Sequence, residues 1–304
     1  MRRCLSFTLG CVFFVLALSC TTTKKNTAER LSSPPKFPVP PATMIEPKDR
    51  ASFIVRNVWN GYDSLTIDLF ESKDAFEQFM VDYFAIGSIA EGQAFSESIA
   101  TALSKSTSEF YAHSMDIGEM YLDHANSPIY NEDAYAILII QALKSPVLSY
   151  ADSVRFVHRL EMYERNKPGE IARDFAIQEF GGGKTALHQI KSPLLALMFY
   201  EPNCETCSEA FDHIVSDSVI KKAVETGRMK LVCIYAGNMM TDYELSRSKV
   251  PAFVTLGHEF EQKIENEELY FIRAFPTIYL LDENKRVLRR DITVEALSDW
   301  LKEK

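Results

Sequence analysis

The sequence predicts a protein of two parts, an all-α domain followed by an α/β domain with a central mixed sheet flanked by helices. Apolar residues recur at helical spacing from residue 51 to about 165, where strand-like alternation is absent. From residue 166 onward, short apolar runs alternate with helical stretches. Within that second part, Cys204 and Cys207 stand where an apolar run ends and a helical stretch begins. A chain of 304 residues is long enough for both domains.

Residues 1–19 are predicted to be a signal peptide. Arg2 and Arg3 form a basic start, and the apolar run 4–18 is too short to cross a membrane as a helix. The run Ala17-Leu18-Ser19-Cys20 then resembles the lipobox of bacterial lipoproteins, in which the cysteine is lipidated after cleavage. This resemblance implies export, lipidation at Cys20, and a position in the cell envelope facing the periplasm. The alternative is a simple secretory signal in which Cys20 has no role.

Residues 20–50 are predicted to form a linker after the lipidated cysteine. They hold six of the 13 prolines of the chain, a composition that favours extended polyproline II over packed structure. Such a segment can hold the folded part away from a membrane surface. A leader without any spacing role is the alternative.

Residues 51–165 are predicted to form a domain of five or six helices, whose function the sequence does not indicate. Val55, Val58 and Tyr62 recur at three- and four-residue steps, as expected for a buried helix face. Asn131, which follows a break at Pro128, is a predicted N-cap for a helix over residues 132–144. Residues 149–165 are expected to form the last helix of this domain.

Residues 166–304 are predicted to form the α/β domain. Apolar runs predict strands at residues 174–177, 194–200, 230–235, 277–281 and 287–290. Helical spacing is found at residues 208–224, 267–271 and 294–302. The glycine run at residues 181–183 is interpreted as a hairpin turn, because a phosphate-binding loop needs a glycine where Gln178 stands.

Cys204 and Cys207 carry the chemistry that the sequence predicts. Two cysteines separated by two residues, where a strand leads into a helix, form a redox arrangement. The first thiol then lies at a helix N-terminus, where outward N–H groups and the helix dipole favour a thiolate. The second thiol lies about one turn further along and is close enough to form a disulfide. Cys233 lies in an apolar run and is expected to be a buried hydrophobic residue.

The second domain resembles the thioredoxin-like superfamily, and within it the membrane-tethered thioredoxin-like and thiol-specific antioxidant branch. Four features carry the resemblance, namely Gly169-x-x-Ala172-x-Asp174-Phe175, Cys204-x-x-Cys207, Ala274-Phe275-Pro276-Thr277 and Tyr279-Leu280-Leu281-Asp282. The resemblance implies that the Phe275–Pro276 peptide bond is cis and lies beside the dithiol. It also implies that Phe275 and Pro276 bind the substrate backbone.

The whole chain is similar to a set of lipoproteins from Gram-negative anaerobes, in which a helical domain of unknown function precedes a thioredoxin-like domain. The matching runs are Asn57-Val58-Trp59-Asn60-Gly61-Tyr62-Asp63, Ser127-Pro128-Ile129-Tyr130-Asn131-Glu132 and Asn166-Lys167-Pro168-Gly169. This resemblance implies an architecture and no activity for the helical domain.

The surroundings of the dithiol depart from the family pattern. Thioredoxins have Trp before the first cysteine and Gly-Pro between the pair, where this chain has Asn203 and Glu205-Thr206. Their buried proton-accepting aspartate is replaced by Met198. Tethered reductases of cytochrome c maturation carry a glutamate where this chain has Ala210. The sequence therefore keeps the dithiol without the usual proton relay.

Several other classes of function are not favoured. A net charge of −9 with no long basic run argues against nucleic acid as a partner. Peroxidase activity is not expected, since Glu201 replaces the threonine that peroxiredoxins need before their cysteine. A metal site formed by Cys204, Cys207 and His213 would lack a fourth ligand, so no metal and no cofactor is predicted.

The sequence thus predicts an exported, membrane-anchored thiol–disulfide oxidoreductase. Its expected partners are exported thiol or disulfide proteins, a membrane redox partner and, through the lipid, the membrane itself. Cys204 is the expected attacking thiolate and Cys207 the expected resolving thiol. The alternative is a protein-binding module with a structural disulfide, in which Trp59, Tyr62 and residues 130–132 hold a partner instead of forming core.

Overall fold

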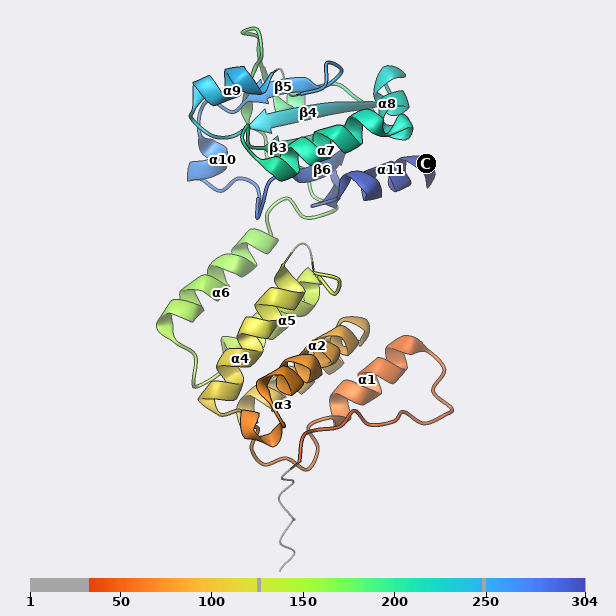
Figure 1. The fold of residues 1–304 in the computed structure, drawn as a ribbon, viewed down its shortest axis with the longest axis vertical. Helices are drawn as coiled ribbons and strands as arrows, with labels where there is room; N and C mark the ends of the chain where they lie inside the picture. Colours follow the sequence, from red (N-terminus) through yellow and green to blue (C-terminus); the bar gives the residue numbers. More distant parts are fainter. Residues whose placement is uncertain (1–32, 125–126, 248–249, 304) are drawn as a thin grey trace, which may run out of the picture.

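A computed structural model describes residues 33–124, 127–247 and 250–303 of the chain. Within these residues the chain forms a helical domain and, after it, a domain built on a mixed sheet (Figure 1). The predicted signal peptide, Cys20 and the first part of the linker lie outside the described residues. No helix in the described part combines the length and the apolar character needed to cross a membrane.

The helical domain follows the predicted pattern. Its elements are α1 (Pro47–Asn57), η1 (Ile67–Leu69), α2 (Lys73–Ile89), α3 (Gly92–Lys105), α4 (Ser108–Gly118), the π-helical turn η2 (Glu119–Asp123), α5 (Glu132–Ala142) and α6 (Tyr150–Tyr163). The predicted N-cap at Asn131 is confirmed, since its side chain accepts a hydrogen bond of 3.0 Å from the Ala134 amide. Ser149 caps α6 in the same way through the Asp152 amide.

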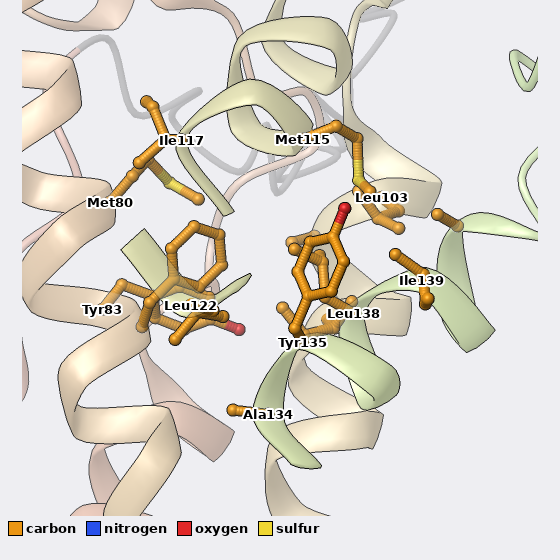
Figure 2. Packing of buried hydrophobic residues seen from close by; sticks show 14 of the residues in the cluster. Met80, Tyr83, Leu103, Met115, Ile117, Leu122, Ala134, Tyr135, Leu138 and Ile139 are labelled. Carbon is orange, nitrogen blue, oxygen red and sulfur yellow. The ribbon is translucent and has the colours of Figure 1, made fainter. Parts of the chain in front are cut away.

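The core of the helical domain is rich in aromatic side chains. Figure 2 shows part of it, where Met80 and Tyr83 from α2 face Leu138 and Tyr135 from α5. Trp59 and Tyr62 are 2% and 7% exposed and belong to this core. They are therefore not free to hold a partner, as the binding-module interpretation had required.

The second domain contains a seven-stranded sheet in the described part of the chain. Its strands are β1 (Ala176–Glu179), β2 (Lys184–Ala186), β3 (Leu194–Tyr200), β4 (Met229–Tyr235), β5 (Thr255–His258), β6 (Thr277–Asp282) and β7 (Val287–Arg290), and their order in the sheet is β2-β1-β5-β4-β3-β6-β7. Strand β3 pairs parallel with β4 and antiparallel with β6, so it is an interior strand next to the middle strand β4. The mixed sheet flanked by helices confirms the predicted fold class.

Helices cover both faces of the sheet. Helices α7 (Glu205–Ser216), α8 (Ser218–Glu225), α9 (Met240–Ser246) and α11 (Val294–Glu303) pack on one face (Figure 1). The other face is covered by η3 (Leu187–Gln189), α10 (Lys263–Asn266) and the segment around Phe175 and Tyr270. The two faces hold separate apolar clusters, and alternate residues of β3 enter one or the other.

Some predicted elements were wrong or incomplete. The predicted helix 267–271 is not one, because the helical turn α10 ends before it at Asn266, and Glu268 follows with a positive φ of 46°. The predicted helix 208–224 is two helices, since Asp217 ends α7 and caps α8 by accepting from the Val219 and Ile220 amides. Strands β2 and β5 and helix α9 were not predicted.

Phe271 connects the two domains through apolar contacts. This residue comes from the sheet domain, but its ring is 7% exposed and belongs to the core cluster of the helical domain. It meets the ring of Tyr163 from α6 edge-on, with 5.5 Å between ring centroids. The guanidinium groups of Arg159, Arg273 and Arg290 lie between 5.2 and 5.8 Å from the centroid of Phe271.

Buried ionic and hydrogen bonds surround Phe271. Arg273 donates to the carbonyl of Asp123, lies 3.4 Å from its carboxylate and also pairs with Asp291. Arg290 pairs with Glu132 of α5 and donates to the carbonyls of Tyr163 and Arg165. Burial raises the pKa of Asp123, although the hydroxyl of Tyr163 and the guanidinium groups of Arg159 and Arg273 favour its charged form. Removal of one partner from these buried pairs at the interface would therefore leave the other charge buried and uncompensated.

Truncation of Phe271 tests how far the helical domain depends on this contact. In a Trp300→Phe background, the fluorescence of Trp59 reports unfolding of the helical domain alone, since the chain has 2 tryptophans. We expect Phe271→Ala to lower the free energy of unfolding of that domain in urea by about 3 kcal/mol, because it removes a buried ring. Phe180→Ala, at a ring that is 44% exposed, is the matched control and should change it by less than about 1 kcal/mol. Equal changes would contradict the role of Phe271.

Candidate functional site

The dithiol lies where the central strand β3 leads into α7. Strand β3 ends at Tyr200, and Cys204 is the N-cap residue of α7. Its sulfur accepts a hydrogen bond of 3.1 Å from the Cys207 amide, so it takes the position that a capping oxygen normally fills. This geometry directs the Cys207 amide of the first turn of α7 toward the sulfur.

The Cys204 thiol also faces the loop that contains Pro276. The Phe275–Pro276 peptide bond is cis, as the resemblance had predicted. The Cys204 sulfur lies 3.6 Å from the carbonyl oxygen of Phe275 and 3.0 Å from the hydroxyl of Thr206. That hydroxyl donates to the same Phe275 carbonyl at 2.8 Å. The structure thus brings together Cys204, Cys207, Phe275 and the adjoining Pro276.

Cys207 and Cys233 are buried beneath this surface. Cys207 is 2% exposed and shares an apolar cluster with Met198, Ala210 and Cys233. Burial raises the pKa of the Cys207 thiol and that of Cys233. Met198 and Ala210 are buried apolar residues, so neither of these two positions offers a carboxylate to take the Cys207 proton. The three cysteines in the described residues, Cys204, Cys207 and Cys233, are free thiols.

Of the three glutamates that are close to the dithiol in sequence, Glu201 acts on it electrostatically, since its charge is among the causes that raise the pKa of Cys207. Glu205 and Glu209 are exposed on α7. Glu201 is half-buried, and its carbonyl oxygen accepts a hydrogen bond of 3.3 Å from the Cys204 amide. The sequence did not single out Thr206 as a functional residue, although a hydroxyl between two cysteines of this spacing is a recognisable signal.

A cavity of about 430 Å³ lies beside the dithiol, between the two domains. Phe275 and Glu201, whose carbonyls contact Cys204, form part of its wall. Ile264 and Glu265 of α10 line another side, and Met162 of α6 contributes from the helical domain. Sequence reasoning did not find this cavity, because its walls come from segments far apart in the chain.

The structure does not assemble the metal site that was considered from the sequence. In the described residues, no group of three or more His, Cys, Asp or Glu side chains is placed to hold a metal ion. His213 instead pairs with Glu295 of α11 at 2.7 Å, on the exposed side of α7.

Comparisons with known proteins agree with this architecture. Residues 19–166 match the family model described as a domain of unknown function, DUF5106. A crystal structure of a thioredoxin-like protein from Bacteroides caccae is 26% identical to this chain with a TM-score of 0.79, over 88% of this chain and 98% of that one. The C-terminal domain of an uncharacterized protein from Bacteroides fragilis is 30% identical over 45% of this chain and 98% of its own, with a TM-score of 0.44.

A third solved structure, of a putative thiol:disulfide interchange protein from Chlorobium tepidum, is 23% identical. It covers 45% of this chain and 96% of its own, with a TM-score of 0.39. No curated protein matches the chain.

Differential alkylation tests the contrast between the two thiols. Because burial keeps Cys207 and Cys233 protonated and covered, brief treatment of the reduced protein with iodoacetamide at neutral pH should modify Cys204 and leave those two unmodified. Peptide mass spectrometry of the digested protein reads the result, and denatured protein, in which all three react, is the control. Modification of Cys207 as fast as that of Cys204 would contradict the described burial.

Proposed function

The chain belongs to the thioredoxin-like proteins and carries a DUF5106 domain before its thioredoxin-like fold. From this premise we propose that it is a thiol–disulfide oxidoreductase. Cys204 is the attacking thiolate and Cys207 the resolving thiol. One observation carries the proposal: a half-exposed sulfur at a helix N-terminus faces a cis-proline loop and lies over a buried partner thiol. That arrangement suits disulfide exchange better than a purely structural crosslink, whose sulfurs would both be covered.

The reaction proceeds in two exchanges. The Cys204 thiolate attacks one sulfur of a substrate disulfide, and the other substrate sulfur leaves as a thiolate and takes up a proton. Cys207 then loses its proton to water and attacks the Cys204 sulfur of the mixed disulfide. The second substrate sulfur leaves as a thiolate, and a Cys204–Cys207 disulfide forms. Two electrons have passed from the dithiol to the substrate, and the reverse sequence oxidises a substrate dithiol.

The cavity between the domains supports a polypeptide substrate. Phe275 and Glu201, which contact Cys204, line it, so we expect a chain that places its cysteine at Cys204 to extend into it. Ile264 and Tyr270 are buried and provide an apolar floor, while Glu265 is exposed at the rim. Exported proteins with thiols or disulfides are the proposed substrates, and a membrane redox protein is the proposed partner that resets the dithiol.

A second candidate function is a protein-binding module with a structural disulfide. A groove of about 440 Å³ between α5 and α6 favours it, because Ile140 and Val157 are partly exposed there beside Glu161 and Glu164. The apolar residues Met198 and Ala210, which share a cluster with Cys207, point the same way. In this alternative, loss of either cysteine would change stability and leave partner binding intact.

Trapping of a mixed disulfide tests the proposed activity. We expect the wild type to reduce insulin in the presence of dithiothreitol, and Cys204→Ser to be inactive, because the attacking sulfur is gone. Cys207→Ser should instead retain a substrate peptide linked to Cys204, since no thiol remains to release it; non-reducing gels and mass spectrometry detect the adduct. Cys233→Ser is the control and should behave as the wild type. Equal, negligible reduction by wild type and Cys204→Ser would support the binding module.

Lipid anchoring at Cys20 and a periplasmic position are further parts of the proposal, supported by the sequence of the first 20 residues. The expected result of Cys20→Ala is release of the exported protein from the membrane fraction, because the acylated sulfur is lost. Fractionation of cells followed by immunoblotting measures this, with Cys204→Ala as the matched control. Membrane association that survives in Cys20→Ala would exclude the lipid anchor.

A further inference from the structure

The groove of about 440 Å³ between α5 and α6 is formed by two helices that run in opposite directions (Figure 1). Ala136 and Ile140 of α5 and Val157 and Leu160 of α6 form its apolar walls. The lining from α5 begins at Glu132 and ends at Ile140, which is about 12 Å of helix at 1.5 Å per residue. The groove is therefore long enough for about two turns of a partner helix.

The apolar walls of this groove are exposed. Val157 is 46% exposed and Ile140 is 40% exposed. Val154, one turn before Val157 on the same face of α6, is exposed as well. The side of α6 that packs into the core is a different one, which carries Phe156 and Tyr163. Helix α6 thus has two apolar faces, and in the described part of the chain the second one is left uncovered.

One end of the groove is acidic. Glu161 lies in the last turn of α6, where the helix dipole disfavours negative charge and where no basic residue is present. Asp133, in the first turn of α5, lines the same groove. The other two carboxylates of the lining, Glu132 and Glu164, have basic partners, whereas Asp133 and Glu161 form no ion pair with another described residue. The charge of Glu161 is thus unfavourable for its own helix and is left for an external cation.

An apolar groove with uncompensated carboxylates at one end fits an amphipathic helix that carries Lys or Arg beside its apolar face. Apolar side chains at three- and four-residue spacing would cover Ile140 and Val157. The basic side chains would face Asp133 and Glu161, so the two surfaces are complementary in charge. The net charge of −9 opposes the approach of a second copy of this chain, and carboxylates at the groove oppose an anionic lipid surface.

We propose that the groove between α5 and α6 is a docking site for a basic amphipathic helix of a partner protein. The apolar face of that helix packs against Ile140 and Val157, and its basic residues pair with Asp133 and Glu161. Glu132 lines the same groove and pairs with Arg290 of β7, so the partner is held next to the sheet domain. The site does not depend on the dithiol and is compatible with either candidate function.

Binding of a synthetic helix tests the docking site. The probe is a fluorescein-labelled peptide of about 18 Leu and Lys residues with all leucines on one helical face, and fluorescence anisotropy with the purified protein gives its Kd. Val157→Ser should raise the Kd about tenfold, because apolar area is lost from the contact. The double variant Asp133→Lys/Glu161→Lys should raise it by about as much and reduce its dependence on salt. Val215→Ser, at a side chain that is 48% exposed on α7, and Glu225→Lys, at an exposed position of α8, are the matched controls.

Equal Kd values for Val157→Ser and Val215→Ser, or for the double variant and Glu225→Lys, would overturn the proposal. A peptide with Glu in place of Lys should bind at least about tenfold more weakly, and equal binding would contradict the role of charge. A dimer in sedimentation equilibrium that Val157→Ser dissociates, without binding of the peptide, would assign the groove to a second copy instead. Cys204→Ser should bind the peptide as the wild type does, so binding supports the site even if the protein does not reduce insulin.

Discussion

The docking of one extended segment, residues 269–276, holds the structure and its candidate site together. Phe271 inserts its ring into the core of the helical domain, and Arg273 pairs with the buried carboxylate of Asp123. Two residues further along, Phe275 presents its carbonyl to Cys204 and Thr206. A shift of the helical domain would therefore move the cis-proline loop. This segment thus connects the core of the helical domain to the loop that faces the dithiol.

The environment of the dithiol follows from simple physical constraints. The Cys204 sulfur caps the start of α7 and accepts from the Cys207 amide, while Cys207 lies in an apolar cluster with Met198, where burial raises the pKa of its thiol. The two thiols are thus unequal before any substrate arrives, as sequential exchange requires. Thioredoxins solve the remaining proton problem with a buried acid. In this chain the hydroxyl of Thr206 lies 3.0 Å from the Cys204 sulfur, on the exposed side of the dithiol.

The sequence allowed the fold class to be predicted because its strongest signals are local. The run at β3, the cysteine pair and the residues around Pro276 each specify an element or a turn without reference to distant residues. The interface could not be predicted in this way. The apolar residues at 267–271 gave a false helical pattern because Phe271 faces the helical domain while Tyr270 faces the sheet. The short strand β5 and the contact of Thr206 with Phe275 likewise depend on residues far apart in sequence.

The reduction potential of the Cys204–Cys207 pair tests the central claim most directly. Equilibration of the protein with glutathione buffers of known composition, followed by alkylation and mass spectrometry, gives the fraction of disulfide at each potential. A redox-active pair is expected to titrate within the range of known exchange proteins, roughly −120 to −270 mV, so that substrates can oxidise and reduce it. A pair that stays oxidised below about −300 mV would be a structural disulfide and would contradict the proposed function.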